Sequence, residues 1–422
     1  MTIGEADIAV VGAGAAGLMT AIWAARGGAR VVLFDTRQKI GAKILISGGT
    51  RCNVTNLQVT PSDYHGAPSH FLKHVLEAFT PAESIHFFES LGVPLVLEPT
   101  GKYFPTTHSG QTVLAALLKE IGRLNVGLRT GICITSVKKS GDGFQLNGQI
   151  FAKRVVLTTG GLSYPETGSD GTGFGIAESL GHTIVQTAPA LTPLTTDDED
   201  WKSLSGVTMD VKLSFYNSGK KKSEQEGSFL FTHFGFSGPA ALDISRHFAL
   251  SKKEDQPEIK ASFLPKFKEE SLKKHFIAAQ KKTHGKFIKN FLTDEFSLPA
   301  RFVEILLKKL KLDEKASVRR VNDPLLGQLT HSLLNCALPV TGVVGYKKAE
   351  VTAGGVDLRE IKVSTMESRL LPGLYFAGEI LDMDGRIGGF NFQWAWSSGA
   401  LAGRSAARSL DCRGVAGRNT LC

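Results

Sequence analysis

The residues with the clearest chemical meaning form a run of small side chains near the N-terminus that could hold a phosphate group. The run follows an apolar segment, residues 8–11, and reads Gly12-Ala13-Gly14-Ala15-Ala16-Gly17. In this spacing the first glycine permits a tight turn, the second lets the backbone approach a pyrophosphate, and the third lets a helix pack closely on a strand. The N-terminus of that helix would direct its unpaired N–H groups and its positive dipole end at the phosphates.

An acidic residue follows at the distance that a nucleotide ribose requires. An apolar, helix-forming segment, residues 18–25, leads to a second apolar strand, residues 31–34, which ends on Asp35. A carboxylate here can hold the hydroxyls of an adenosine ribose. The order of these segments is therefore that of a dinucleotide-binding βαβ unit: strand, glycines, helix, second strand and acid. This complete order is a far more specific signal than the glycines alone.

Two later segments favour FAD as the dinucleotide. A strand-rich stretch, residues 124–157, ends in Thr158-Thr159-Gly160-Gly161, and an apolar strand, residues 373–377, closes on Gly378 and Glu379. This layout is typical of flavoproteins with two dinucleotide-binding folds, in which the late acid or its neighbour reaches the ribityl chain. No second G-x-G-x-x-G follows a strand. We therefore expect any nicotinamide dinucleotide to bind only transiently.

Two further loops carry residues that suit a flavin. From the first we predict a loop that wraps the flavin and its diphosphate, made by Lys43, Ser47, Gly48, Gly49, Arg51 and Asn53. In the second, a glycine pair opens a helix whose free N–H groups could face the flavin N1–C2=O edge and stabilise the reduced anion. Its predicted binding residues are Asp382, Gly388, Gly389, Asn391 and Gln393. The alternatives are an ordinary polar turn for the first loop and an aromatic core helix for the second.

Composition limits the class of protein. A chain of 422 residues is expected to form two or three domains. Its five cysteines contain no C-x-x-C pair, which argues for reduced thiols in the cytoplasm and against a structural metal. The N-terminus has no basic region, and its first apolar run is interrupted by the glycines. We therefore expect neither a signal peptide nor a membrane span.

Positive charge is concentrated in one segment. The chain has a net charge of +9, and residues 251–320 contain 18 Lys/Arg against 10 Asp/Glu, a net of +8. A solvated helical surface would explain such a segment. The alternative is a surface for a polyanion, most plausibly nucleic acid.

The basic segment belongs to a region that interrupts the flavoprotein pattern. We predict an FAD-binding domain formed by residues 1–188 and 341–422, with an inserted domain at residues 189–340. The insert is expected to be β-rich over residues 189–265 and helical and basic over residues 266–325. An active site between the two domains is the default expectation.

These motifs together resemble the bacterial BaiN/RdsA family of FAD-dependent oxidoreductases over nearly the full chain. The similarity includes the loop Ser47-Gly48-Gly49-Thr50-Arg51-Cys52-Asn53 within residues 43–56, and it extends through residues 161–168, 231–239, 365–368 and 382–396. Thr50 departs from a third glycine that is common in the family, and Phe390 departs from a frequent tyrosine. Because phenylalanine has no hydroxyl, the side chain at position 390 can make no hydrogen bond here.

The resemblance implies an α/β fold: a Rossmann-like FAD-binding domain with an inserted β-barrel plus helical domain. It also implies reduction of an activated C=C bond with NAD(P)H as the electron source, either in a uridine of 23S ribosomal RNA or in steroid-like enones of bile-acid metabolism. The basic insert, residues 252–320, favours ribosomal RNA as the partner, since a small enone has no evident use for it. A small-molecule enone or quinone reductase and a non-catalytic flavoprotein are the remaining alternatives.

In the RNA reaction, hydride from the flavin would reach C6 of uracil and an acid would protonate C5. Cys52, in the flavin-wrapping loop, is the favoured acid, although the charge of Arg51 beside it would favour the thiolate. His233 is the second candidate for the acid. Arg386 could hold a uracil carbonyl or a phosphate. A packed cysteine, a loop histidine and a surface arginine are the alternatives.

Overall fold

The computed structural model describes residues 6–282 and 285–411 and divides the chain into two compact units. One unit combines the segments Met1–Ala188 and Val351–Cys422, and the other is Pro189–Glu350. The first contains the predicted FAD-binding residues, and the second contains the basic segment.

The first unit is built on a mainly parallel sheet. Its strand order is β7 (Gly127–Thr130), β2 (Val31–Asp35), β1 (Ala6–Val11), β10 (Ile150–Leu157), β9 (Gly143–Leu146) and β8 (Val137–Ser140), with β20 (Leu374–Phe376) also paired to β10. The pairings β7–β2–β1–β10–β20 are parallel, whereas β10–β9 and β9–β8 are antiparallel. Residues Ile8 to Val11 of β1 are almost completely buried. Continuous apolar burial is typical of a parallel strand that is covered on both faces.

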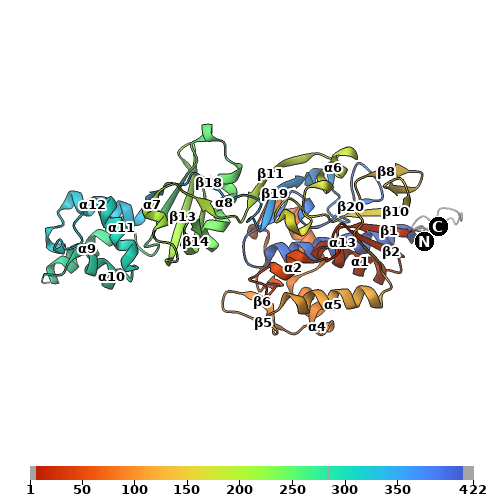
Figure 1. Ribbon diagram of the computed structural model, residues 1–422, viewed down its shortest axis with the longest axis horizontal. Coiled ribbons are helices and arrows are strands. Elements are labelled where there is room, and N and C mark those ends of the chain that lie inside the picture. The colour runs from red at the N-terminus through yellow and green to blue at the C-terminus, as the bar shows by residue number, and fades with distance from the viewer. Residues whose placement is uncertain (1–5, 283–284, 412–422) are drawn as a thin grey trace. The chain divides into compact units, whose positions relative to one another are not determined.

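Helices α1 (Ala15–Arg26) and α13 (Phe390–Asp411) pack closely together beside this sheet (Figure 1). A Cβ atom placed on Gly399 would lie 2.7 Å from the carbonyl oxygen of Ala16, and one on Gly403 would lie 2.4 Å from that of Thr20. Small residues on α13 therefore allow the two backbones to approach. The N-terminus of each helix follows one of the predicted glycine motifs.

The other elements of the first unit surround this layer. Its remaining helices are α2 (Ala42–Ile46), α3 (Ser69–Ala78), α4 (Pro81–Ser90), α5 (Gly110–Arg123) and α6 (Thr172–Ser179), with short 3-10 turns η1 (Pro61–Asp63), η2 (Pro165–Thr167), η5 (Leu358–Glu360) and η6 (Gly378–Ile380). Its small sheets are β3 (Thr55–Asn56) with β6 (Lys102–Pro105) and β5 (Leu95–Leu97), β4 (Tyr64–His65) with β21 (Asp384–Gly385), and β11 (Ile184–Ala190) with β19 (Val351–Val356).

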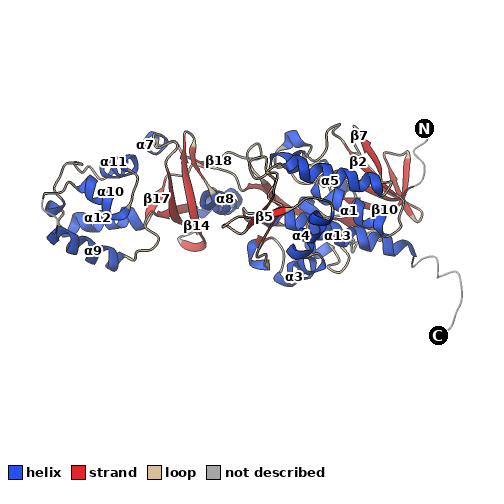
Figure 2. Cartoon of the chain, turned by 90° about the horizontal axis from the view of Figure 1, so that it is seen from below, coloured by secondary structure: helices blue, strands red, loops and turns tan. Residues whose placement is uncertain are grey.

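The second unit combines an antiparallel sheet with a group of helices. The sheet order is β17 (Cys336–Leu338), β16 (Glu258–Ser262), β13 (Thr208–Asn217), β14 (Lys220–Thr232), β15 (Gly235–Ser237), β12 (Leu194–Thr195) and β18 (Gly342–Val343). The helices are α7 (Glu199–Lys202), α8 (Pro239–Leu250), α9 (Glu269–Lys282), α10 (Ile288–Phe296), α11 (Ala300–Lys309) and α12 (Asp323–Leu334), with η3 (Lys253–Asp255) and η4 (Val318–Arg320). Figure 2 shows α9 to α12 gathered beyond β17 at one end of this unit.

The expectation of an inserted β-barrel needs correction. The strand pairings of the second unit run in one open path from β17 to β18, and no pairing between described residues joins these two strands. A barrel requires that closing pairing. The insert is therefore an antiparallel sheet with helices, and α8 occupies part of the segment that we expected to be β-rich.

Candidate flavin-binding site

The three glycines of the N-terminal motif have three different surroundings. Gly12 has a φ of +103°, and a Cβ there would lie 2.6 Å from the Thr158 carbonyl oxygen. A Cβ on Gly17 would lie only 1.8 Å from the Gly12 carbonyl oxygen, so this glycine holds α1 against the turn. Around a Cβ on Gly14, by contrast, no heavy atom of another described residue lies within 4 Å, its two chain neighbours aside. The motif therefore leaves open space at the one glycine where a pyrophosphate must approach.

Asp35 stands at the end of β2, next to this turn. Its Oδ2 accepts a hydrogen bond from the Ala13 N–H at 2.7 Å, and its Oδ1 accepts one from the Arg37 N–H at 2.8 Å. An ionised carboxylate can accept about four hydrogen bonds, so both oxygens keep capacity for ribose hydroxyls. The half-buried carboxylate thus lies beside the glycine turn and keeps the capacity that the predicted ribose contact needs.

We expect Asp35→Ala to weaken FAD binding by about 1–3 kcal/mol, because the charge-assisted hydrogen bond to the ribose is removed. Titration of the apoprotein with FAD measures this change. Since Asp35 also fixes the Ala13 N–H, urea unfolding of the apoprotein serves as the control for damage to the turn. Unchanged affinity for FAD would contradict the role of Asp35.

A compact polar cluster forms around Glu379 at the start of η6. Its Oε2 accepts a hydrogen bond from the Lys43 ammonium at 2.6 Å, and its Oε1 accepts one from the Ser163 hydroxyl at 2.5 Å and one from the Thr352 N–H at 3.0 Å. Lys43 also donates to the Ser163 hydroxyl at 2.6 Å. Lys43 and Glu379 keep 25% and 17% of their side-chain exposure, so the pair remains accessible to a ligand.

The motifs do not identify Ser163 and Thr352 as partners of Glu379. The Thr352 hydroxyl also accepts the N–H groups of Leu162 and Ser163, which are about 190 residues earlier in the chain. The only signal in the sequence is the resemblance that includes residues 161–168. The neighbouring Gly161 is a glycine because a Cβ there would lie 2.4 Å from the Thr352 hydroxyl oxygen.

Arg51, a predicted cofactor ligand, and Cys52, the predicted acid, have different surroundings. Arg51 forms an ion pair with Glu98 at 2.6 Å, and its guanidinium lies 3.9 Å from the centre of the Phe104 ring. Cys52 is completely buried, and burial raises the pKa of its thiol to about 12 against a smaller opposing effect of the Ser47 hydroxyl. A buried, protonated thiol cannot contact a substrate in this conformation. The structure corrects our assignment of Cys52 as the acid and matches the alternative of a packed side chain.

Of the other two catalytic candidates, Arg386 belongs to the first unit and His233 to the second. Arg386 is half exposed, with its Nε 2.8 Å from Asp63 Oδ1 and its guanidinium over the Phe390 ring. His233 is exposed in the turn between β14 and β15 of the second unit, against the ring of Phe234. Arg386 therefore adjoins the start of α13, but its charge is already engaged by a carboxylate.

The glycine pair before α13 lies where the sequence suggests. Gly389 has a φ of +94°, and a Cβ there would come within 2.8 Å of the Thr55 carbonyl group. Asn391 fixes the preceding turn, since its side chain both accepts the Gly385 N–H and donates to the Gly385 carbonyl at 2.8 Å. The first N–H groups of a helix have no partner within the helix. This end of α13 can therefore donate hydrogen bonds to a ligand.

Gln393 has no free hydrogen-bonding capacity for a cofactor. Its Oε1 accepts the hydroxyls of Thr55 at 2.6 Å and Ser84 at 3.0 Å, and its Nε2 donates to the Phe79 carbonyl at 2.8 Å and to the Ser397 hydroxyl at 3.0 Å. The side chain is fully buried. The predicted contact with the cofactor is wrong because two acceptor and two donor positions are all used inside the protein.

We expect Gln393→Leu to lower the free energy of unfolding by about 2–4 kcal/mol, because the substitution leaves several buried polar groups without partners. Urea unfolding of the apoprotein measures the decrease. The absorption spectrum of bound FAD should stay as in the unsubstituted protein. A normal stability combined with an altered flavin spectrum would restore Gln393 as a cofactor ligand.

The remaining residues predicted to bind the cofactor also belong to the first unit. Ala15 begins α1, and Ala16 lies against Gly378, where a Cβ would come 2.6 Å from the Ala16 side chain. The Ser47 hydroxyl donates to the Ile44 carbonyl at 3.1 Å, and the backbone N–H of Asp382 donates to the Val356 carbonyl at 3.0 Å. The other glycines fall in turns of the first unit: Gly48, Gly49, Gly160 and Gly388.

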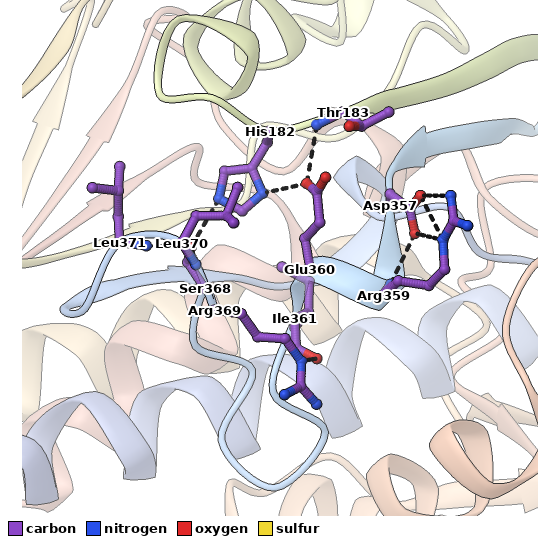
Figure 3. A network of polar contacts seen from close by, with 10 residues as sticks. All are labelled: His182, Thr183, Asp357, Arg359, Glu360, Ile361, Ser368, Arg369, Leu370 and Leu371. Atoms are coloured by element: carbon purple, nitrogen blue, oxygen red, sulfur yellow. Dashed lines mark hydrogen bonds and ion pairs between the residues drawn. The ribbon is translucent and has the colours of Figure 1, made fainter.

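A buried histidine network supports the strand that leads to Glu379 (Figure 3). His182 Nδ1 lies 3.0 Å from Glu360 Oε2, and its Nε2 lies 2.9 Å from the Ser368 hydroxyl oxygen. The imidazole ring packs edge-on against Phe376 of β20. Burial lowers the pKa of His182, although Glu360 opposes the shift, so the ring is neutral at neutral pH. The one signal for this network in the sequence is the resemblance that includes residues 365–368.

The residues around the predicted cofactor position fit FAD. Two side-chain oxygens there are buried without a hydrogen-bond partner among the described residues, Asn53 Oδ1 and Thr159 Oγ1. The open space beside Gly14 and the accessible Lys43–Glu379 pair also fit FAD. Unpartnered buried oxygens are costly and call for a donor that the protein itself does not supply.

The fold and this site define an FAD-dependent oxidoreductase with a Rossmann-like domain. The chain belongs to the family described as HI0933-like protein Rossmann domain, whose model matches residues 6–405. This family includes the BaiN/RdsA proteins, so the resemblance seen in the sequence is confirmed.

Two similar proteins are named for different substrates. A 3-dehydro-bile acid delta(4,6)-reductase of Clostridium scindens is 35% identical over 407 residues, covering 95% of this chain and 98% of that protein. A ribosomal RNA dihydrouridine synthase of Escherichia coli K12 is 36% identical over 401 residues, covering 93% and 96%. A 3-ketosteroid delta1-dehydrogenase from Sterolibacterium denitrificans superposes with a TM-score of 0.51 at 13% identity, covering 96% of this chain and 100% of that chain, which indicates a shared fold alone.

Two properties of the described residues bear on membranes and metals. Over residues 6–282 and 285–411, no helix has the length and apolarity needed to cross a membrane. The same residues contain no cluster of three or more His, Cys, Asp or Glu side chains arranged to hold a metal ion.

Proposed function

We propose that this protein reduces a uridine of large-subunit ribosomal RNA to dihydrouridine. A relative of nearly equal length carries the name ribosomal RNA dihydrouridine synthase at 36% identity. The observation that favours RNA over a small substrate is the set of exposed cations, without ion-pair partners among the described residues, on the helices of the second unit. Phosphate contacts from such cations supply most of the affinity of a protein for nucleic acid.

Part of the basic segment is neutralised by nearby carboxylates. Lys273 pairs with Glu269 at 2.6 Å, and Lys289 pairs with both Glu304 and Glu314. Lys308 and Lys309 likewise pair with aspartates of α7 and its N-cap. These lysines support the alternative of a solvated surface, so they are poor candidates for binding RNA.

Several of the free cations lie along α9 or near its C-terminal end. Lys274, Lys281 and Lys282 are exposed, and no ion pair with another described residue involves them. Lys274 and Lys281 are seven residues apart and so share one face of the helix. The Gln280 side chain donates to the carbonyls of Val318 and Val321, which holds η4 and the exposed Arg320 beside the last turn of α9. We call Lys274, Lys281, Lys282 and Arg320 the α9 basic patch.

When bound, FAD would supply the hydride that is added to C6 of uracil. The chain's own residues would bind and orient the cofactor. Asp35 and the turn around Gly14 would hold the ADP half, and the Lys43–Glu379 pair would hold the ribityl chain. With Cys52 buried, His233 is the remaining candidate for protonation of C5. We infer that NAD(P)H delivers electrons during a brief encounter, because the chain has one phosphate-binding glycine fingerprint.

The test is to measure dihydrouridine in ribosomal RNA from a strain that lacks the gene, with and without complementation. We expect one uridine position to lose the modification and to recover it with the unsubstituted gene but not with an Asp35→Ala variant. The purified enzyme with NAD(P)H should form dihydrouridine in ribosomal RNA. Intact modification in the deletion strain would reject the proposal.

A small-molecule enone reductase is the second candidate, favoured by the 35% identity to the bile-acid reductase. The same purified enzyme should be offered a 3-keto-4-ene steroid in place of RNA. Turnover of the steroid without any action on RNA would make this candidate the better one.

A further inference from the structure

Asn53 has a buried amide with an unsatisfied oxygen. The residue is only 7% exposed, and its Oδ1 has no hydrogen-bond partner among the described residues. A buried carbonyl oxygen in this condition lowers stability, so such groups are rare unless a bound molecule supplies the donor. The arrangement points to a ligand N–H or O–H group at this position.

The position of this oxygen limits which part of a ligand it can meet. A Cβ on Gly389 would lie 2.9 Å from Asn53 Oδ1, so the oxygen lies directly beside the glycine that precedes α13. The first N–H groups of that 22-residue helix have no acceptor within the helix. An acceptor and a group of donors therefore stand side by side.

We propose that Asn53 Oδ1 accepts the N3–H of the flavin pyrimidine ring, while the N-terminal N–H groups of α13 donate to the adjacent C2 carbonyl. The flavin presents a donor and an acceptor on neighbouring ring atoms, which matches this pair. The ribityl hydroxyls have the Lys43–Ser163–Glu379 cluster for their partners instead. The proposal rests on FAD binding and is independent of the substrate.

Asn53 is thus a positioning residue that binds the pyrimidine edge of the flavin. The test uses the complete protein reconstituted with FAD that carries ¹⁵N at N3. In the unsubstituted protein we expect the N3 proton to exchange with solvent slowly. In Asn53→Ala the exchange should be at least about tenfold faster, and FAD should bind roughly 3- to 10-fold more weakly, as expected when one hydrogen bond is removed. Asn53→Asp keeps an acceptor oxygen and should retain slow exchange.

A second arm uses FAD methylated at N3, and its first comparison is made in the unsubstituted protein. The unsubstituted protein should bind this analogue more than about tenfold more weakly than FAD, because the methyl group removes the donor and meets the buried oxygen. In Asn53→Ala the difference between the two cofactors should shrink to about threefold or less. Equal exchange rates in both proteins, or an unchanged affinity for N3-methyl FAD, would overturn the proposal. Neither readout involves RNA, so a failure here is distinct from a failure of the proposed function.

Discussion

Gly17→Ala is expected to lower the free energy of unfolding by at least about 3 kcal/mol, at the upper end of what overpacking costs. The new methyl group would lie 1.8 Å from the Gly12 carbonyl oxygen and 2.8 Å from the Thr158 hydroxyl oxygen. The first of these is backbone, which cannot move aside without displacing the turn that precedes α1. Urea unfolding of the apoprotein measures the decrease.

Gly14→Ala is the matched control, because it adds the same methyl group to the same motif. Gly14 has a φ of −79°, and apart from its chain neighbours no described residue has a heavy atom within 4 Å of the added Cβ. The apoprotein should therefore keep its stability to within about 1 kcal/mol, the scale of an altered helix N-cap. Affinity for FAD should fall by more than about tenfold, because the methyl group fills the space in which the pyrophosphate approaches the backbone. Normal binding of FAD by Gly14→Ala would contradict the assigned site.

The second large effect concerns RNA. The double variant Lys274→Glu/Lys281→Glu is expected to bind ribosomal RNA roughly 10- to 100-fold more weakly at low salt, because each reversed side chain repels a phosphate that the lysine would neutralise. The slope of log affinity against log salt should become shallower by about 0.7 for each phosphate of a single strand that is no longer neutralised. The flavin spectrum and the oxidation of NAD(P)H should not change, since these residues lie outside the unit that contains the flavin-binding residues.

The control is Lys119→Glu/Lys138→Glu, which makes the same change in net charge on exposed residues of the first unit. We expect this variant to keep most of the affinity for RNA. An equal decrease in both variants would show that net charge alone attracts the RNA. Unchanged binding by the Lys274→Glu/Lys281→Glu variant would make the α9 basic patch a solvated surface.

Much of the ADP half of the site could be predicted from the sequence because its determinants are local. Within six residues, Gly12 specifies a tight turn, Gly14 leaves room for a pyrophosphate to approach the backbone, and Gly17 allows a close contact between helix and strand. The periodicity of the flanking segments specifies β1, α1 and β2. The structure adds that Asp35 also accepts the N–H groups of Ala13 and Arg37. Backbone constraints of this kind depend on neighbours in the chain, so a single sequence expresses them.

The partners of the flavin-end residues were decided by tertiary structure. Arg51 and Cys52 are adjacent in sequence, yet one side chain pairs with Glu98 while the other is buried in the core. Gln393 looked like a ligand by residue type, but residues more than 300 positions away satisfy most of its hydrogen-bonding capacity. Residue type specifies the capacity to donate and accept hydrogen bonds, whereas the fold specifies which partners use it.

The charge of residues 251–320 could be counted from the sequence, but its availability could not. Lys273 and Lys274 are neighbours, and of the two only Lys273 pairs with a described carboxylate, one helical turn earlier on α9. Lys309 is neutralised by Asp198, which is more than 100 residues away. The sequence determined that this protein carries a dinucleotide-binding unit and a basic insert. The fold decided which cations stay free and which polar groups keep capacity for a ligand, because chain segments distant in sequence supply the partners.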